Sequence, residues 1–271
     1  QLSAAAPTDP QLHSLSTRYT GPGAPQGRTL FLHTSPESPM KRLLAAGSGP
    51  IFQLCKVFRD AEAGRLHNPE FTLLEWYRPD YDHRQLMTEV AELVSHLLED
   101  RVPLGATEWM TYEDAFLRHT GLNPLTASGA QWAACARQHG ISASGLRPDA
   151  LDGWRDLLLT HLIEPHLGQG RLTFLYDYPA SQAALARLRP DKPAVAERFE
   201  LYLHGVELAN GFHELGDAGE QRRRFEADLA RRQTLGLAWM PPDEHLLAAL
   251  EHGLPACAGV ALGVDRLVML A

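Results

Sequence analysis

Charged and aromatic side chains gather in three short segments of this 271-residue chain. The first, residues 58–77, contains Arg59, a turn, aromatic residues and several carboxylates. The second and third are residues 207–212 and 259–267, each mixing polar side chains with glycine. Three such clusters, far apart in the sequence, predict one site that assembles when the chain folds.

The residue types suit activation of a carboxylate by ATP. That reaction needs a cation at the α-phosphate and a metal ion for the departing pyrophosphate. Arg59, at the end of a predicted strand, can present its planar guanidinium to the α-phosphate. Glu200 and Glu207 lie on strands joined by a predicted tight turn at residues 204–205. Two carboxylates so close repel each other unless they share a cation, so we expect Mg²⁺ there.

The same reaction needs a surface for adenine. Phe71 and Arg266 can hold a purine between them by stacking and cation–π contact. Gly263 would let the nucleotide approach the backbone closely. Taken singly, such residues are more often structural: an arginine in a surface ion pair, a core aromatic, solvent-facing strand carboxylates and a packing glycine. Only their combination favours the nucleotide site.

The charge balance bears on the class of partner. A net charge of −8 argues against a general nucleic-acid surface, which would show an excess of Lys and Arg. The dense basic run at residues 222–224 lies among carboxylates in a predicted helix, so we interpret it as a solvated face.

Cysteine, histidine and hydropathy patterns limit the other classes. Three widely spaced cysteines form no disulfide framework, which fits a reducing compartment. Thirteen scattered histidines show no ligand spacing, so zinc is not expected. Because no run reaches the ~18 apolar residues of a membrane span, we expect a cytoplasmic protein without a membrane partner.

The segments require an antiparallel framework to bring them together. Residues 51–59 and 71–78 predict a hairpin, and residues 28–34, 172–176, 199–203, 206–210 and 259–264 further strands. Helices are predicted at 36–46, 82–100, 112–119, 129–139, 149–166, 220–235 and 244–250, with another starting at 265. We therefore predict a single α+β domain over residues 1–271, with an irregular arm at 1–28 and a natural protein that continues beyond this chain.

The three segments resemble the signature motifs of a known family. Residues 58–77 resemble the second motif, and residues 259–267 the third motif, of the class II aminoacyl-tRNA synthetases of the lysyl and aspartyl group. Residues 207–215 are similar to the lysyl enzymes in particular. Closer still is the likeness to the lysyl-synthetase paralogues that ligate (R)-β-lysine to translation elongation factor P. It covers nearly all of the chain from residue 18 and includes residues 34–37, 40–44, 52–55, 179–183 and 195–200.

The resemblance implies a class II synthetase-like antiparallel sheet flanked by helices, a homodimer, ATP with Mg²⁺, and an aminoacyl-adenylate passed to a lysine of elongation factor P. It assigns catalysis to Arg59, Glu207 and Arg266, and metal binding to Glu200 and Glu207. The ATP contacts that it implies are Arg59, Glu62, His67, Asn68, Phe71, Glu207, Leu208, Gly263 and Arg266. The substrate contacts that it implies are Ser35, Glu37, Tyr77, Asn210, Glu214 and Ala261.

Departures from the family pattern keep two alternatives open. Ala61 stands where the synthetases usually carry a glutamate, and Glu62 comes one position late, which on a strand would turn it to the opposite face. This loss favours a catalytically inactive synthetase-like binding or regulatory protein. The other alternative is a truncated lysyl-tRNA synthetase that uses α-lysine and tRNA. Ala261, in place of the usual glycine, and the missing anticodon-binding domain count against tRNA as a partner.

Overall fold

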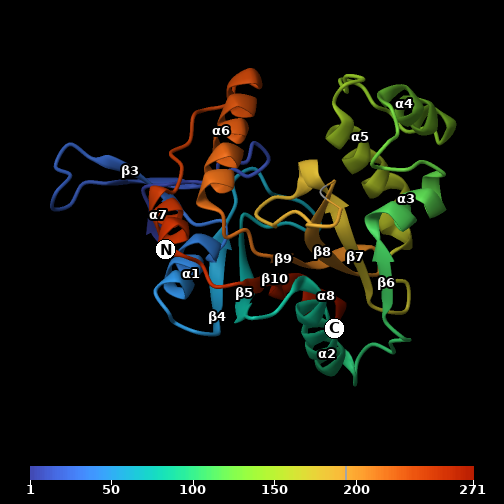
Figure 1. Ribbon diagram of the computed structural model, residues 1–271, viewed down its shortest axis with the longest axis horizontal. Coiled ribbons are helices and arrows are strands. Elements are labelled where there is room, and N and C mark those ends of the chain that lie inside the picture. Colours follow the sequence, from blue (N-terminus) through green and yellow to red (C-terminus); the bar gives the residue numbers. More distant parts are fainter. Residues whose placement is uncertain (193) are drawn as a thin grey trace. The chain divides into compact units, whose positions relative to one another are not determined.

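Seven strands form the larger sheet in the computed structural model, which describes residues 1–192 and 194–271 (Figure 1). They are β4 (Ile51–Phe58), β5 (Glu70–Pro79), β6 (Glu108–Thr111), β7 (Thr173–Pro179), β8 (Val195–Leu203), β9 (Val206–His213) and β10 (Cys257–Gly263). Their order is β4-β5-β10-β9-β8-β7-β6. Helices accompany this sheet, so the α+β prediction is confirmed. One correction concerns strand direction, because β6 pairs with β7 in parallel and the sheet is mixed.

The chain divides into two units by its internal contacts. Unit 1 comprises Gln1–Asp80, Leu215–Cys257 and Ala261–Val268, and unit 2 comprises Tyr81–Glu214, Ala258–Val260 and Met269–Ala271. The prediction that residues 1–271 fold as one domain stays a prediction.

The hairpin of unit 1 confirms its sequence prediction. Strands β4 and β5 pair antiparallel from Ile51 opposite Tyr77 to Phe58 opposite Glu70. The loop between them is closed by a hydrogen bond from the Arg59 backbone N–H to the Pro69 carbonyl, 2.9 Å long. Helices α1 (Glu37–Ala45), α6 (Ala218–Thr234) and α7 (Glu244–His252) lie in the same unit, and α8 (Val264–Leu270) begins there.

The N-terminal arm is more ordered than predicted. Residues 1–28 contain β1 (Leu2–Ser3) and β2 (Ser16–Tyr19), which flank β3 (Arg28–Leu32) in a separate three-stranded sheet. The expectation of an irregular arm is therefore wrong for these two strands. Backbone pairing to β3 holds them, as in Thr17 opposite Leu30, and most of their side chains are exposed, so no apolar alternation marked them.

The arginines of α6 are engaged within unit 1. Arg222 pairs with Glu244, and both Arg223 and Arg224 pair with Glu220. Each arginine of the run at residues 222–224 thus pairs with a carboxylate of the same unit, and such pairs are common on solvated faces.

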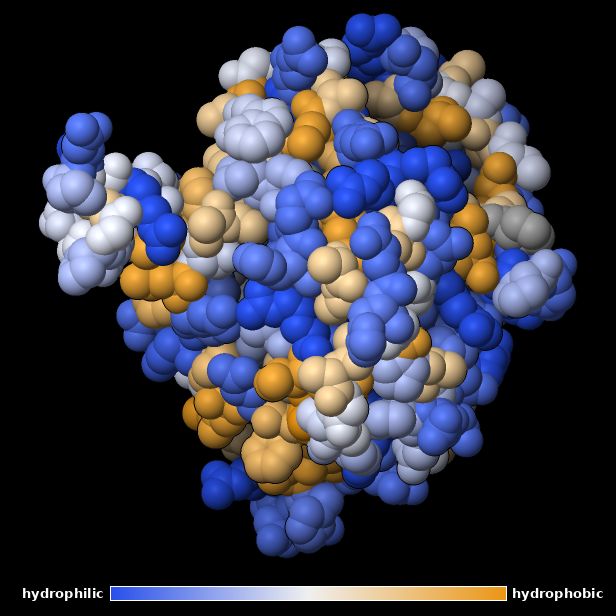
Figure 2. Space-filling view, turned by 60° about the vertical axis from the view of Figure 1, so that its left-hand side comes forward, coloured by the Kyte–Doolittle hydropathy of each residue, from blue (hydrophilic) through white to orange (hydrophobic). Residues whose placement is uncertain are grey.

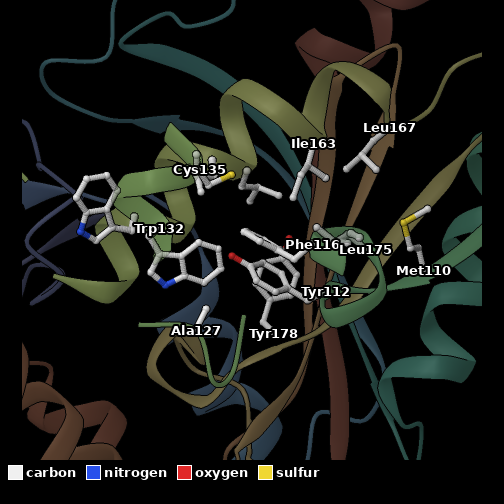
Figure 3. Packing of buried hydrophobic residues seen from close by; sticks show 14 of the residues in the cluster. Met110, Tyr112, Phe116, Ala127, Trp132, Cys135, Ile163, Leu167, Leu175 and Tyr178 are labelled. Atoms are coloured by element: carbon white, nitrogen blue, oxygen red, sulfur yellow. The ribbon is translucent and has the colours of Figure 1, made fainter. Parts of the chain in front are cut away.

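Unit 2 is built on an aromatic core. Helix α2 (His83–Leu98) begins with a capping box between Asp82 and Gln85. Helices α3 (Tyr112–Thr120), α4 (Gly129–Gln138) and α5 (Leu151–Leu158) follow, and α5 runs into a π-helical segment, Leu159–Ile163. Figure 3 shows Trp132 and Phe116 in this core. Their rings pack edge to face, with ring centroids 5.6 Å apart.

The turn between β8 and β9 is the predicted two-residue turn. His204 and Gly205 both have positive φ angles, 52° and 72°, as a tight hairpin turn of this twist requires.

The surface in Figure 2 is mostly hydrophilic, with hydrophobic residues in separate areas. Among the described residues, no helix combines the length and apolar character that crossing a membrane requires.

Candidate active site

Arg59 lies at the mouth of the hairpin loop in unit 1. Its guanidinium carbon is 5.0 Å from the centroid of the Phe71 ring, and one of its terminal nitrogens is 3.7 Å from Glu62. Arg59 Nε has no hydrogen-bond partner within the described chain. The guanidinium is therefore held over an aromatic surface, and its buried Nε–H is a donor without a partner among the described residues.

The position of Glu62 corrects the argument from strand faces. Glu62 lies in the loop after β4, so the alternation of a strand does not apply to it. Ala61 adopts a left-handed backbone with φ of 61°, and this turns the chain so that Glu62 faces Arg59. A carboxylate near Arg59 is thus retained, one position later than the family pattern.

The third motif is joined to β5 within unit 1. Asp265, in the first turn of α8, accepts a hydrogen bond from the Thr72 backbone N–H at 2.6 Å. Arg266 lies 2.9 Å from His67 Nε2. The structure therefore brings Arg59, His67, Phe71 and Arg266 to one part of the unit. The cation over Phe71 is Arg59, whereas Arg266 contacts His67.

A buried carboxylate occupies the centre of β5. Glu75 is 2% exposed and accepts hydrogen bonds from Ser35 Oγ at 2.8 Å and from the Tyr77 hydroxyl at 2.7 Å. Burial, and then the negative charge of Glu37, raise the pKa of Glu75 to about 7. Each carboxylate oxygen can accept one hydrogen bond more. Glu75 can thus receive a substrate ammonium group between two hydroxyls.

Glu37 is the second carboxylate of this region. It forms a 2.6 Å ion pair with Lys41, whose side chain is 2% exposed. The Glu37 backbone N–H donates to Ser35 Oγ at 3.0 Å, so Ser35 links Glu37 to Glu75. The predicted substrate residues Ser35, Glu37 and Tyr77 therefore surround Glu75, which the sequence reasoning had given no role.

In unit 2, Glu200 lies on β8 in a ring of donors. It accepts hydrogen bonds from the hydroxyls of Tyr178 and Tyr202, each 2.6 Å long, and from Arg198 at 2.5 Å. Its partner in the predicted metal site, Glu207, lies on β9 opposite Tyr202. The β8–β9 hairpin therefore places both carboxylates beside the same tyrosine position.

Glu164 is a third carboxylate in this part of unit 2. Burial, and then the charges of Glu200 and Glu207, raise its pKa to about 7. Burial is the larger cause, and the negative charges of Glu200 and Glu207 add to it, so the Glu164 carboxyl favours its protonated form beside them. Hard oxygen ligands with surplus negative charge fit Mg²⁺, which would be held by Glu200 and Glu207 with Glu164 adjacent.

The remaining predicted residues occupy varied positions. Asn68 is exposed in the hairpin loop, Leu208 is buried on β9, and Ala261 and Gly263 are half-buried on β10. Asn210 Oδ1 accepts no hydrogen bond from the described residues. Glu214 is 5% exposed and directly follows β9.

Two carboxylates of these clusters were not predicted. Glu75 stood within the second motif, and its alternation with Tyr77 on one strand face was the signal that could have identified it. Glu164 lies 36 residues before Glu200 with no alternation between them, so no sequence pattern connected the two.

Comparison with known proteins agrees with this arrangement. Residues 8–271 match the family described as tRNA synthetases class II (D, K and N). The chain belongs to this family. The resemblance drawn from the three segments is thereby confirmed, as is the class II synthetase fold.

Within this class II family, three similar relatives are each called elongation factor P--(R)-beta-lysine ligase. The protein of Pectobacterium carotovorum is 53% identical over 270 residues, which cover 100% of this chain and 82% of that protein. The protein of Edwardsiella ictaluri has the same identity and coverage. The protein of Vibrio vulnificus is 53% identical over 99% of this chain and 82% of its own length.

Proposed function

We propose that this chain is a ligase that activates (R)-β-lysine with ATP to an adenylate and transfers it to a lysine side chain of elongation factor P. The observation that carries the proposal is the identity of 51–53% to ligases of that name, over essentially the whole chain. Class II family membership supports ATP as the activating substrate.

The chain's own residues divide the work of the first step. Arg59 stabilises the negative charge that develops at the α-phosphate when the substrate carboxylate attacks it. Phe71 and Arg266 hold adenine, with His67 and Asn68 at the nucleotide. Glu200 and Glu207 would hold Mg²⁺, which when bound would supply charge neutralisation for the departing pyrophosphate.

Substrate selection rests on Glu75 and its two hydroxyl donors. The hydroxyls of Ser35 and Tyr77 fix the carboxylate, and an ammonium group of (R)-β-lysine would replace the proton that burial of Glu75 favours. A substrate without this ammonium leaves a buried carboxylate unpaired, which costs binding free energy. Asn210, Glu214 and Ala261 contact the rest of the amino acid.

ATP–pyrophosphate exchange tests the proposal directly. We expect exchange with (R)-β-lysine well above that with α-lysine, and loss of exchange without Mg²⁺. Elongation factor P incubated with the enzyme, ATP and (R)-β-lysine should gain one β-lysyl group by mass spectrometry. Preference for α-lysine with charging of tRNA would instead indicate a lysyl-tRNA synthetase, and no exchange with either substrate an inactive relative.

A homodimer is a further part of the proposal, supported by the resemblance to the class II synthetases. Sedimentation equilibrium tests it, because a monomer mass at micromolar concentration would contradict it. We likewise propose that tRNA is not an acceptor, which the net charge of −8 supports.

A further inference from the structure

A second cluster of possible metal ligands in unit 2, which includes neither Glu200 nor Glu207, consists of two histidines and a carboxylate. His83 is the first residue of α2, Glu197 lies on β8 and His213 ends β9. All three are buried, and one ligand atom from each lies within 4.8 Å of the others. His83 and His213 are 130 positions apart in the sequence, so no short ligand spacing indicated the cluster.

The hydrogen bonding of His83 is incomplete. Its side chain is 6% exposed, and neither ring nitrogen has a hydrogen-bond partner among the residues that the structure describes. Asp177 Oδ1, which also has none there, lies 3.8 Å from His83 Nε2. Buried polar atoms in native proteins nearly always have a hydrogen-bond or metal partner. The two ring nitrogens of His83 and Asp177 Oδ1 therefore indicate a binding partner from outside the chain.

We propose that His83, Glu197 and His213 bind a divalent metal ion of the Zn²⁺ type, with Asp177 as the fourth ligand. Imidazole nitrogens and carboxylate oxygens are ligands that Zn²⁺ accepts in tetrahedral sites. Such a site fixes the start of α2 against β8 and β9. It is separate from the proposed ligase chemistry, because it contains none of the residues assigned to ATP or lysine.

The spacing of the ligand atoms is close to that of a zinc site. Zn–N and Zn–O distances of about 2.0–2.1 Å place neighbouring ligand atoms about 3.3 Å apart in a tetrahedron. His213 Nδ1 and Glu197 Oε2 are 2.8 Å apart. All three ligand atoms lie within 4.8 Å of one another. Side-chain shifts of about 1 Å would therefore bring them to the spacing of a tetrahedral zinc site.

Arginines on the outer side of the cluster compete with a cation. Arg187 forms a 2.5 Å bond with Glu197, and Arg189 forms one of the same length with Asp177. Arg84 lies 3.8 Å from Asp177. Their side chains are 40%, 25% and 52% exposed, whereas those of both carboxylates are about 10% exposed. The arginines can therefore turn into solvent when a metal binds, while the carboxylates stay.

Metal titration of the intact protein tests the site. We expect one equivalent of Co²⁺ to bind in the presence of excess Mg²⁺, with the visible absorption of a tetrahedral nitrogen-containing site. His83→Gln should weaken Zn²⁺ binding at least tenfold in a chelator competition. His96→Gln is the matched control, because His96 lies on the same helix, is 74% exposed and pairs only with Glu99 among the described contacts. This control should bind Zn²⁺ like the wild type.

A second measurement needs no variant. Nitrogen-15 NMR of the histidine rings should show large shifts of the His83 and His213 signals at one equivalent of Zn²⁺ and unchanged signals of His96. Absence of a stoichiometric site in the wild type, equal affinities of His83→Gln and His96→Gln, or ring shifts confined to other histidines would each overturn the proposal.

Discussion

Replacement of Glu75 by glutamine should change how stability depends on pH. The pKa of Glu75 is raised from 4.5 to about 7 in the folded protein, chiefly by burial and then by Glu37. Between these two values the unfolded chain releases the proton that the folded protein keeps. The unfolded state thus binds fewer protons, and the free energy of unfolding falls as pH rises. The contribution is fully present below pH 4.5 and is lost by about pH 7.

The size of the effect follows from the two pKa values. Applying the linkage relation with pKa values of 4.5 and about 7, Glu75 lowers the free energy of unfolding by roughly 2.5 kcal/mol between pH 5 and pH 8. Glutamine cannot ionise, so Glu75→Gln lacks this loss. The polar groups around Glu75 all remain in the variant. They are the hydroxyls of Ser35 and Tyr77, the Glu37–Lys41 pair and the thiol of Cys55.

Urea unfolding of both proteins at pH 5 and pH 8 measures the effect. We expect the difference in free energy between Glu75→Gln and the wild type to increase by roughly 2.5 kcal/mol over this range in favour of the variant. Exchange activity with (R)-β-lysine should fall in the variant at every pH. A difference that stays constant from pH 5 to pH 8 would refute the reasoning, because Glu75 would then ionise alike in both states.

Three further predictions concern single side chains. Arg59→Ala should reduce ATP–pyrophosphate exchange about 100- to 1,000-fold, since a charge-stabilising donor is lost. Arg65→Ala, an exposed arginine of the same loop, should leave exchange unchanged, and equal losses in both would contradict the role of Arg59. Trp132→Ala should cost about 3–5 kcal/mol of unfolding free energy, because Trp132 is fully buried. Asp82→Ala removes the N-cap of α2 and should cost about 1 kcal/mol in denaturant titration; no change would indicate that packing alone fixes the helix start.

Sequence patterns predicted the elements whose side chains alternate or repeat. The hairpin of β4 and β5 and the helix α2 were predicted because apolar residues recur at periods of two and 3.6. Strand β6 was not predicted, since its four residues are too few for a period to show. Strands β1 and β2 were not predicted either, because their backbone pairing with β3, and not a pattern of side chains, defines them.

The candidate site was predictable to the extent that it lies in continuous motifs. Arg59, His67, Phe71 and Arg266 come from two such motifs, and the structure brings them together in unit 1. The raised pKa values of Glu75 and Glu164 depend on burial and on charges from other elements, which no local pattern encodes. The left-handed turn at Ala61 is a further example, because alanine gives no sign of a positive φ.

In the proposed function, strand β5 would set the distance between the adenine contact at Phe71 and the ammonium contact at Glu75. Phe71, Glu75 and Tyr77 occupy alternate positions of one strand, so their side chains share a face. Four residues at about 3.3 Å each separate Phe71 from Glu75 by roughly 13 Å along the backbone. An amino acid whose ammonium reaches Glu75 while its carboxylate meets the nucleotide must span a fixed interval. Insertion or deletion of two residues within β5 would change this interval while keeping Phe71 and Glu75 on the same face of the strand.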